Sequence, residues 1–183
     1  MLLAFARIES WGNVEAFAKQ YAVHPAMVFV DSGDNTTEVY RECAKRNWKT
    51  AKGSGSDDFA VTDRDGKTSR RYYSEKQAIV VPGIPQRAIL VSHSNTSGKD
   101  LLHGLRARRV WSYSLDATPE YVEQLNAEVR IKDRRTGKPQ WILPQGKKDN
   151  HALDAEILAL LAAVRWGIAG RETAETDLPS GTP

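Results

Sequence analysis

The stretch VFVDSGDNTTEVY, residues 28–40, decides the fold predicted for this chain. Its apolar residues end at Asp31, and a Ser-Gly turn then leads into a polar run with helical spacing. An apolar strand, a tight turn and an amphipathic helix in this order are typical of a mostly parallel α/β sheet. A continuous apolar run also indicates a strand covered on both faces. We therefore predict an α/β fold whose mixed sheet has helices on both faces and residues 26–31 at or near its centre.

Apolar periodicity extends this prediction along the chain. Helices are predicted at residues 11–21, 36–48 with Asn35 or Thr36 as N-cap, 99–109, 118–133 with Pro119 in the first turn, and 149–167 with Asp149 or Asn150 as N-cap and Gly167 at the end. Strands are predicted at residues 1–7, 26–31 and 88–92, and a turn with a short strand at 136–144. The Asp65-Gly66 pair predicts a hairpin tip.

The composition predicts a single globular domain. The chain has 183 residues, 40% of them hydrophobic and 27% charged, which is ordinary for a protein with one core. No apolar run approaches the ~20 residues that span a bilayer, so we predict neither a membrane partner nor a signal peptide. The single cysteine, Cys43, excludes an internal disulfide and fits a reducing cytoplasm. We assign residues 1–168 to the domain and residues 169–183 to a mobile tail.

Several common catalytic motifs are absent. The stretch HSNTSGKD, residues 93–100, ends like a phosphate-binding loop, but His93 replaces the first glycine and Asp100 replaces the final Ser or Thr. No G-x-S-x-G nucleophile motif occurs. The four histidines are isolated in the sequence and, with one cysteine, do not form a zinc motif; they are His24, His93, His103 and His151.

Carboxylates remain as the candidate chemistry. Asp31 ends a strand predicted to be buried, and Asp154 lies in the first turn of the last predicted helix. Each has an ordinary structural interpretation, because an aspartate can bond its own backbone in a turn and acids are favoured at helix N-termini. Together they fit a site in which two carboxylates hold Mg²⁺ or Mn²⁺ for phosphodiester cleavage.

The order of four segments adds a family resemblance. VFVDSGDNTTEVYRECAKRNWKTAKG, GKDLLHGL, YVEQLNAEV and NHALDAEILALLAAVRWG follow one another as in the nuclease half of tailed-phage large terminase subunits of the lambda-like type, which this chain resembles over residues 11–167. The resemblance implies a ribonuclease H-like fold and cleavage of concatemeric double-stranded DNA during genome packaging. It also implies that Asp31 and Asp154 are the catalytic, metal-binding acids.

Further residues and partners follow from the resemblance. Asp34, Asp149, His151 and Lys99 are expected to surround the metal site, whereas Glu128 is interpreted as a solvated helix acid. The implied partners are the terminase ATPase half, the small terminase subunit and the portal, in the cytoplasm of the host cell.

The chain departs from the family in two ways. It contains no phosphate-binding loop of an ATPase half, and no acid in residues 1–8 matches the aspartate of the family's first strand. We therefore expect an N-terminally truncated nuclease domain with very weak activity alone, which a second chain carrying the missing strand should restore. The alternatives are a catalytically inactive remnant that binds DNA or a partner, and a fragment of another ribonuclease H-like enzyme such as a resolvase or transposase.

Basic clusters are candidates for contact with the DNA backbone, although each could equally be a solvated surface patch. The chain has a formal net charge of +3 and a pI near 9.0, which permits an anionic partner. The candidate residues are Lys67, Arg70, Arg71, Arg106, Arg108, Arg109, Lys132, Arg134, Arg135 and Lys138.

Overall fold

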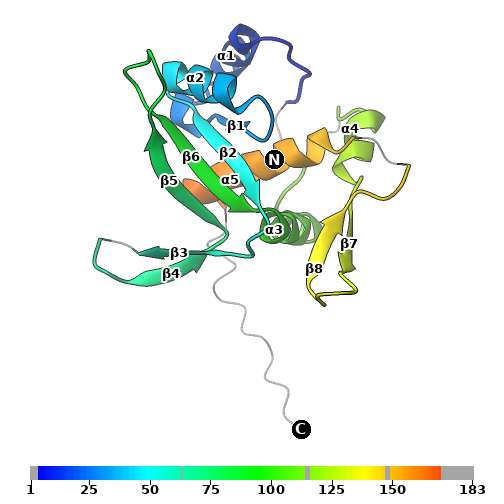
Figure 1. The fold of residues 1–183 in the computed structure, drawn as a ribbon. Helices are drawn as coiled ribbons and strands as arrows, with labels where there is room; N and C mark the ends of the chain where they lie inside the picture. Colours follow the sequence, from blue (N-terminus) through cyan, green and yellow to red (C-terminus); the bar gives the residue numbers. More distant parts are fainter. Residues whose placement is uncertain (1–3, 63, 114–115, 147–148, 170–183) are drawn as a thin grey trace.

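The computed structural model describes residues 4–62, 64–113, 116–146 and 149–169, and these form a mixed α/β fold (Figure 1). This confirms the predicted class. The helices are α1 (Trp11–Gln20), a 3-10 turn (Pro25–Met27), α2 (Thr36–Arg46), α3 (Asn95–Ala107), α4 (Pro119–Leu125) and α5 (His151–Arg165). The strands are β1 (Phe29–Asp31), β2 (Lys49–Ser54), β3 (Phe59–Thr62), β4 (Thr68–Arg71), β5 (Tyr73–Ile79), β6 (Ala88–Ser94), β7 (Val129–Lys132) and β8 (Pro139–Ile142).

The main sheet has the strand order β1-β2-β6-β5, in which β1, β2 and β6 are parallel and β5 is antiparallel to β6. Asp31 is in register with Ala51, and Ala51 with Val91. Residues in register on neighbouring strands point to the same face of a sheet. Helix α5 covers this face, where Leu161 packs against Ala51 and Val91. The carboxyl end of β1 therefore faces the helix that carries Asp154.

Helix α2 packs on the opposite face of the sheet. Ala44 of α2 packs with Val81 and Ala88, while Cys43 belongs to a second cluster that includes Trp48. Figure 1 shows α1 and α2 together on the β1 side of the molecule and α5 crossing behind the strands. Helices thus cover both faces, as predicted.

The predicted central position of residues 26–31 is wrong. Within the described residues, β1 is an edge strand that pairs only with β2, and residues 25–27 form the 3-10 turn that precedes it. The apolar run arises because α1 and α2 cover one face of β1 and α5 the other, with Val28 and Val30 in one cluster and Phe29 in another. An apolar run indicates that both faces of a strand are buried. It does not indicate whether other strands hydrogen-bond to its two edges.

Three other local predictions need correction. Residues 4–7 form no strand, and residues 1–3 lie outside the described part. The helix predicted at 118–133 ends at Leu125, and Val129–Lys132 instead forms a hairpin with Pro139–Ile142, closed by a turn in which Gly137 has a φ of +70°. Strands β2 and β5 were not predicted, because they form through pairing with their neighbours, β2 with β1 and β6 and β5 with β6.

The remaining outcomes follow the sequence pattern. A hairpin forms with its turn around Asp65-Gly66, and α5 ends at Arg165 just before Gly167, whose φ is +69°. The predicted mobile tail falls almost wholly on residues 170–183, which lie outside the described residues. No helix in the described ranges is long and apolar enough to cross a bilayer.

Candidate functional site

Asp31 lies at the carboxyl end of β1 with an exposed side chain. Its Oδ1 accepts a hydrogen bond from the backbone N–H of Gly33 at 3.2 Å, so the aspartate also has the turn-forming role that its sequence context allows. Parallel strands β1, β2 and β6 end at the same edge of the sheet, and this edge is where open α/β sheets place ligands. Both roles are compatible, because Oδ2, the second carboxylate oxygen, accepts no hydrogen bond within the described residues.

The close approach of the backbone to Asp31 depends on Gly33. A Cβ added at Gly33 would lie 3.1 Å from Oδ2 of Asp31, closer than ordinary van der Waals contact. We expect Gly33→Ala to displace the Asp31 carboxylate and to weaken Mn²⁺ binding about 10-fold, the lower end of the cost of losing a group that orients a metal ligand. Calorimetric titration of Mn²⁺ measures this. Gly104→Ala is the matched control, because a Cβ there meets nothing within 4 Å. Equal affinities for all three proteins would contradict the role of Asp31.

Asp154 lies in the first turn of α5 and feels the charge of four neighbours. Desolvation raises the pKa of its carboxyl above the ordinary value, and Lys99 opposes this, while Glu128 and Asp31 raise the pKa further and His151 lowers it. The side chain of Asp154 nevertheless remains exposed to solvent. The structure thus brings Asp31 and Asp154 within electrostatic reach of one another, from segments more than a hundred residues apart.

Glu128 is not the solvated helix acid that the sequence suggested. It follows α4 outside any helix, and its side chain is only 5% exposed. Nζ of Lys99 donates to both of its oxygens at 2.7 Å, and Nδ2 of Asn150 donates to Oε1 at 2.7 Å. Nearby, Oε1 of Gln124 accepts from the backbone N–H of Ala152 at 3.2 Å. These contacts join α3, α4 and the start of α5, and so hold the turn that carries Asp154.

His93 is a site residue that sequence analysis missed. It lies on β6 two positions beyond Val91, on the same face of the sheet as Asp31, and is 5% exposed. Burial lowers the pKa of its imidazole, Asp31 opposes this and Lys99 adds to it, so the ring is neutral at pH 7. Its Nδ1 is buried without a hydrogen-bond partner in the described residues. The alternation of side chains along β6 could have predicted that His93 and Val91 point to the same face. It could not have predicted that only β2 separates β6 from β1.

The other residues predicted to surround the site are exposed, and of Asp34, Asp149 and His151 only His151 acts on the pKa of Asp154. Asp34 is exposed, and its Oδ1 accepts from the backbone N–H of Asn35 at 2.9 Å. Asp149 and His151 are exposed and lie 3.7 Å apart. Glu156, two positions after Asp154 in the sequence, is buried in the core, where Trp111 and Tyr121 each donate to it at 2.6 Å. Across the residues that the structure describes, no group of three or more His, Cys, Asp or Glu side chains is arranged to hold a metal ion.

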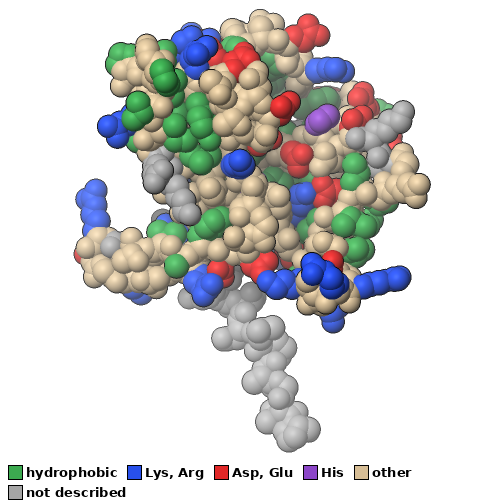
Figure 2. All heavy atoms as spheres, in the orientation of Figure 1, with side chains coloured by type: hydrophobic (Ala, Val, Ile, Leu, Met, Phe, Trp, Pro, Cys, Tyr) green, Lys and Arg blue, Asp and Glu red, His purple; other side chains and the backbone are tan. Residues whose placement is uncertain are grey.

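The predicted DNA-binding residues form separate groups. Lys and Arg side chains project at the ends of both hairpins in Figure 2. Arg70 forms a two-pronged pair with Asp58 at 2.8 and 2.7 Å, and Lys138 lies 3.6 Å from Asp57. Arg106 donates to Asn126 at 3.0 Å. The remaining candidates are exposed; they are Lys67, Arg71, Arg108, Arg109, Lys132, Arg134 and Arg135.

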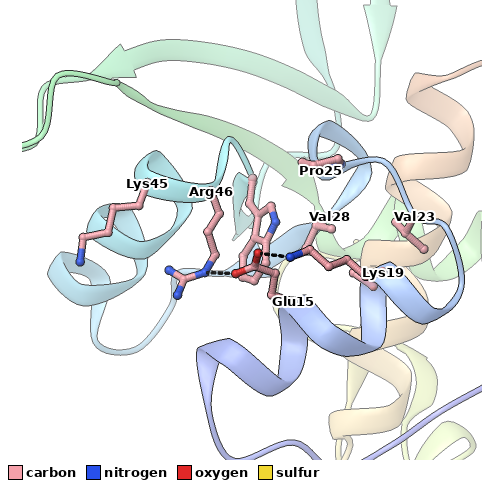
Figure 3. A pocket seen from close by; sticks show the side chains of 9 residues that line it. Glu15, Lys19, Val23, Pro25, Val28, Lys45 and Arg46 are labelled. Atoms are coloured by element: carbon pink, nitrogen blue, oxygen red, sulfur yellow. Dashed lines mark hydrogen bonds and ion pairs between the residues drawn. The ribbon is translucent and has the colours of Figure 1, made fainter.

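A hollow of about 350 Å³ between α1 and α2 is a weaker candidate (Figure 3). Glu15 pairs there with Lys19 at 2.8 Å and with Arg46 at 3.3 Å. Arg46 and Lys45 also pair with Glu42. Because these charged side chains form ion pairs with one another, they offer no unpaired charge to which a ligand could bind.

Comparison with known proteins agrees with the resemblance seen in the sequence. Residues 12–174 match the family described as terminase large subunit gpA, endonuclease domain. Among curated proteins and among solved structures, nothing matches. The family match spans most of the chain and includes all the strands and helices described above apart from the first residue of α1, and it includes Asp31 and Asp154. The chain therefore belongs to the family of terminase large subunit gpA endonuclease domains, which are nucleases of phage DNA packaging.

Proposed function

We propose that this chain is a metal-dependent endonuclease domain that cuts concatemeric double-stranded DNA during phage genome packaging, with Asp31 and Asp154 as its catalytic acids. The observation that supports the proposal is that Asp154 lies within electrostatic reach of Asp31, which ends β1 at the carboxyl edge of the parallel strands. Burial is the main cause that raises the pKa of Asp154, and the charge of Asp31 adds to it. Two acids that repel one another at a solvent-accessible edge are stabilised by a bound cation.

The donor set fits Mg²⁺ or Mn²⁺. Both ions prefer hard oxygen ligands, and Mg²⁺ is commonly held by one or two carboxylates with waters and substrate phosphates completing the shell. Asp31 and Asp154 would supply the carboxylates, and both reach solvent. Glu128 is engaged by Lys99 and Asn150 and is not counted as a ligand. When bound, the cation would supply an activated water and stabilise the leaving oxygen in phosphodiester cleavage.

The residues around the acids act by holding them in place. Lys99 and Asn150 bind Glu128 from α3 and from the start of α5, so the first turn of α5 cannot shift without breaking these bonds. Gly33 lets the chain turn close against Asp31. Such preorganisation is what keeps catalytic groups within the narrow range of productive geometry.

We further propose that a third carboxylate reaches the site on a strand that pairs with β1. In the described residues β1 hydrogen-bonds only to β2, which leaves its other backbone edge open to a strand from another segment or chain. This arrangement would accommodate the ribonuclease H-like fold that the family resemblance implies. The proposal extends to the terminase ATPase half, the small terminase subunit and the portal as partners, in the host cell cytoplasm.

The proposal is tested by titrating Mn²⁺ into the protein calorimetrically. We expect Asp31→Asn to weaken Mn²⁺ binding about 10-fold or more, because loss of a ligand removes both charge and geometry. We also expect binding to weaken as the pH falls through the raised pKa of Asp154, since a ligand carboxyl must be deprotonated. Asp154→Asn should bind weakly and remove this pH dependence. Equal heats for the wild type and Asp31→Asn would overturn the assignment.

Binding to DNA is expected to be independent of sequence and steeply dependent on salt. Each phosphate neutralised by Lys or Arg releases a counterion, so a protein with several contacts loses about 10³-fold or more in affinity between 50 and 200 mM salt. Anisotropy of a labelled duplex at several salt concentrations, without metal, measures the slope. An affinity that does not change with salt, or no binding at low salt, would remove the basic clusters from the proposal.

A further inference from the structure

Two hollows adjoin along the outer side of α3. The first has a volume of about 310 Å³ and includes Lys99, Glu128 and Trp141 in its lining. The second has a volume of about 520 Å³. His103, Arg106 and Asn126 line both hollows, so the two form one continuous groove. We call this the α3 groove and define it by Lys99, His103, Arg106, Arg109, Trp111 and Tyr113.

The groove starts beside the candidate site. Lys99 at its near end pairs with Glu128 and lowers the pKa of Asp154. Its far end lies past the C-terminus of α3, at Arg109 and Tyr113. From Lys99 to Ala107 the helix rises about 12 Å, at 1.5 Å per residue. An elongated ligand that fills the groove would therefore pass close to Asp154 at one end.

The far end of the groove carries uncompensated positive charge. Arg106 donates to the neutral amide of Asn126, and neither Arg106 nor Arg109 forms an ion pair within the described residues. The acids nearer the site are already paired: Glu128 with Lys99, and Asp100 with Arg130 at 2.8 Å. The groove thus offers cations to an anionic ligand and presents no free carboxylate that would repel it.

Aromatic rings line the same groove. Trp141 lies against His103 with ring centroids 5.8 Å apart, and Tyr113 is exposed at the far end. Trp111 donates its indole N–H to the buried Glu156 at 2.6 Å, which holds the ring in one orientation. Rigid aromatic rings next to arginines are the common means by which proteins bind unpaired nucleotides, because every base has a face that can stack.

We propose that the α3 groove binds an unpaired DNA strand next to the cleavage site. This inference rests on the proposed function, because that proposal is what makes the Lys99 end of the groove adjacent to a cleavage site. A duplex cannot use the groove in this way, because its bases are paired and stacked inside the helix and offer no free face to the aromatic rings. Hollows of roughly 300–1,000 Å³ hold small molecules of nucleotide size. The groove would therefore hold one strand of a locally opened or frayed duplex.

The test compares single-stranded and duplex DNA in EDTA, using anisotropy of a labelled ten-residue oligothymidylate and a duplex of the same length. We expect Arg109→Ala and Tyr113→Ala each to weaken single-strand binding by at least about 5-fold, the lower range for loss of one stacked base. Tyr113→Ala, which keeps every charge, should change duplex binding less than about twofold. Tyr113→Phe keeps the ring and should keep the affinity. Arg41→Ala removes an exposed arginine of α2, away from the groove, and should change neither.

Two results would overturn the proposal. Unchanged single-strand affinity in both groove variants would show that the groove is not used. An equal loss of duplex and single-strand affinity in Tyr113→Ala would show a general DNA-binding surface rather than a site for unpaired DNA. Because the assay contains no metal, failure of the cation site would appear in the Mn²⁺ titration and not here.

Discussion

Asp154→Asn should lower Mn²⁺-dependent cleavage of duplex DNA by about 100-fold or more, which corresponds to a loss of roughly 2.7 kcal/mol of transition-state stabilisation. Asparagine keeps the size of the side chain but removes the charge that would hold the cation between α5 and β1. Because the described residues bring two acids together rather than three, we expect even the wild type to be slow. The rate should therefore be measured in single turnover, with protein in excess over labelled duplex.

Stability provides a second readout for the same variant. The folded-state pKa of Asp154 is raised, so its contribution to stability is present below the unfolded pKa and is lost as the pH rises through the folded pKa. At pH 7 the ionised side chain therefore opposes folding, and Asp154→Asn should be no less stable than the wild type in urea. Loss of cleavage together with retained stability would identify a functional acid rather than a structural one.

A control and two contrary outcomes complete this experiment. Asp57→Asn changes an exposed acid between β2 and β3 and should leave the rate unchanged. Absence of metal-dependent cutting by the wild type, even with a strand supplied in trans at the β1 edge, would favour a DNA-binding remnant. Robust cutting by the 183-residue chain alone would mean that a third acid is already at the site, and Asp34, Glu9 and Asp149 would be examined first.

Lys99→Met should destabilise the fold by about 3–5 kcal/mol, the usual cost of leaving a buried charge without its partner. The side chains of Lys99 and Glu128 are only 11% and 5% exposed, so the loss of the ammonium group would leave the Glu128 carboxylate largely desolvated and without its charged partner. Urea unfolding followed by tryptophan fluorescence measures the change in the free energy of unfolding.

The double variant Lys99→Met/Glu128→Gln separates charge from packing. It removes the uncompensated carboxylate while keeping an acceptor for Asn150, and most of the stability should return. A cost below about 1 kcal/mol for the single variant would match an exposed ion pair instead. In that case the pair could not be what holds the first turn of α5.

The sequence by itself was sufficient for features that depend on neighbouring residues. The strand ending at Asp31, helices α1 and α2, the turn at Asp65-Gly66 and the extent of α5 were all predictable. Each is determined by local periodicity, caps and turn residues, which act over a few positions. The family was predictable for a different reason, because the order of four segments is itself a property of the sequence.

Tertiary structure alone decided the position of each strand in the sheet and the environment of each charge. The run that ends at Asp31 was apolar because two faces were covered, yet β1 lies at the edge, since pairing depends on segments far along the chain. Glu128 looked like a solvated helix acid, but in the fold it is buried and paired with Lys99, which lies 29 positions away in the sequence. His93 looked isolated, but the sheet places it on the same face as Asp31, two strands away and within electrostatic reach. Burial and charge act through space, and only the fold brings these residues together.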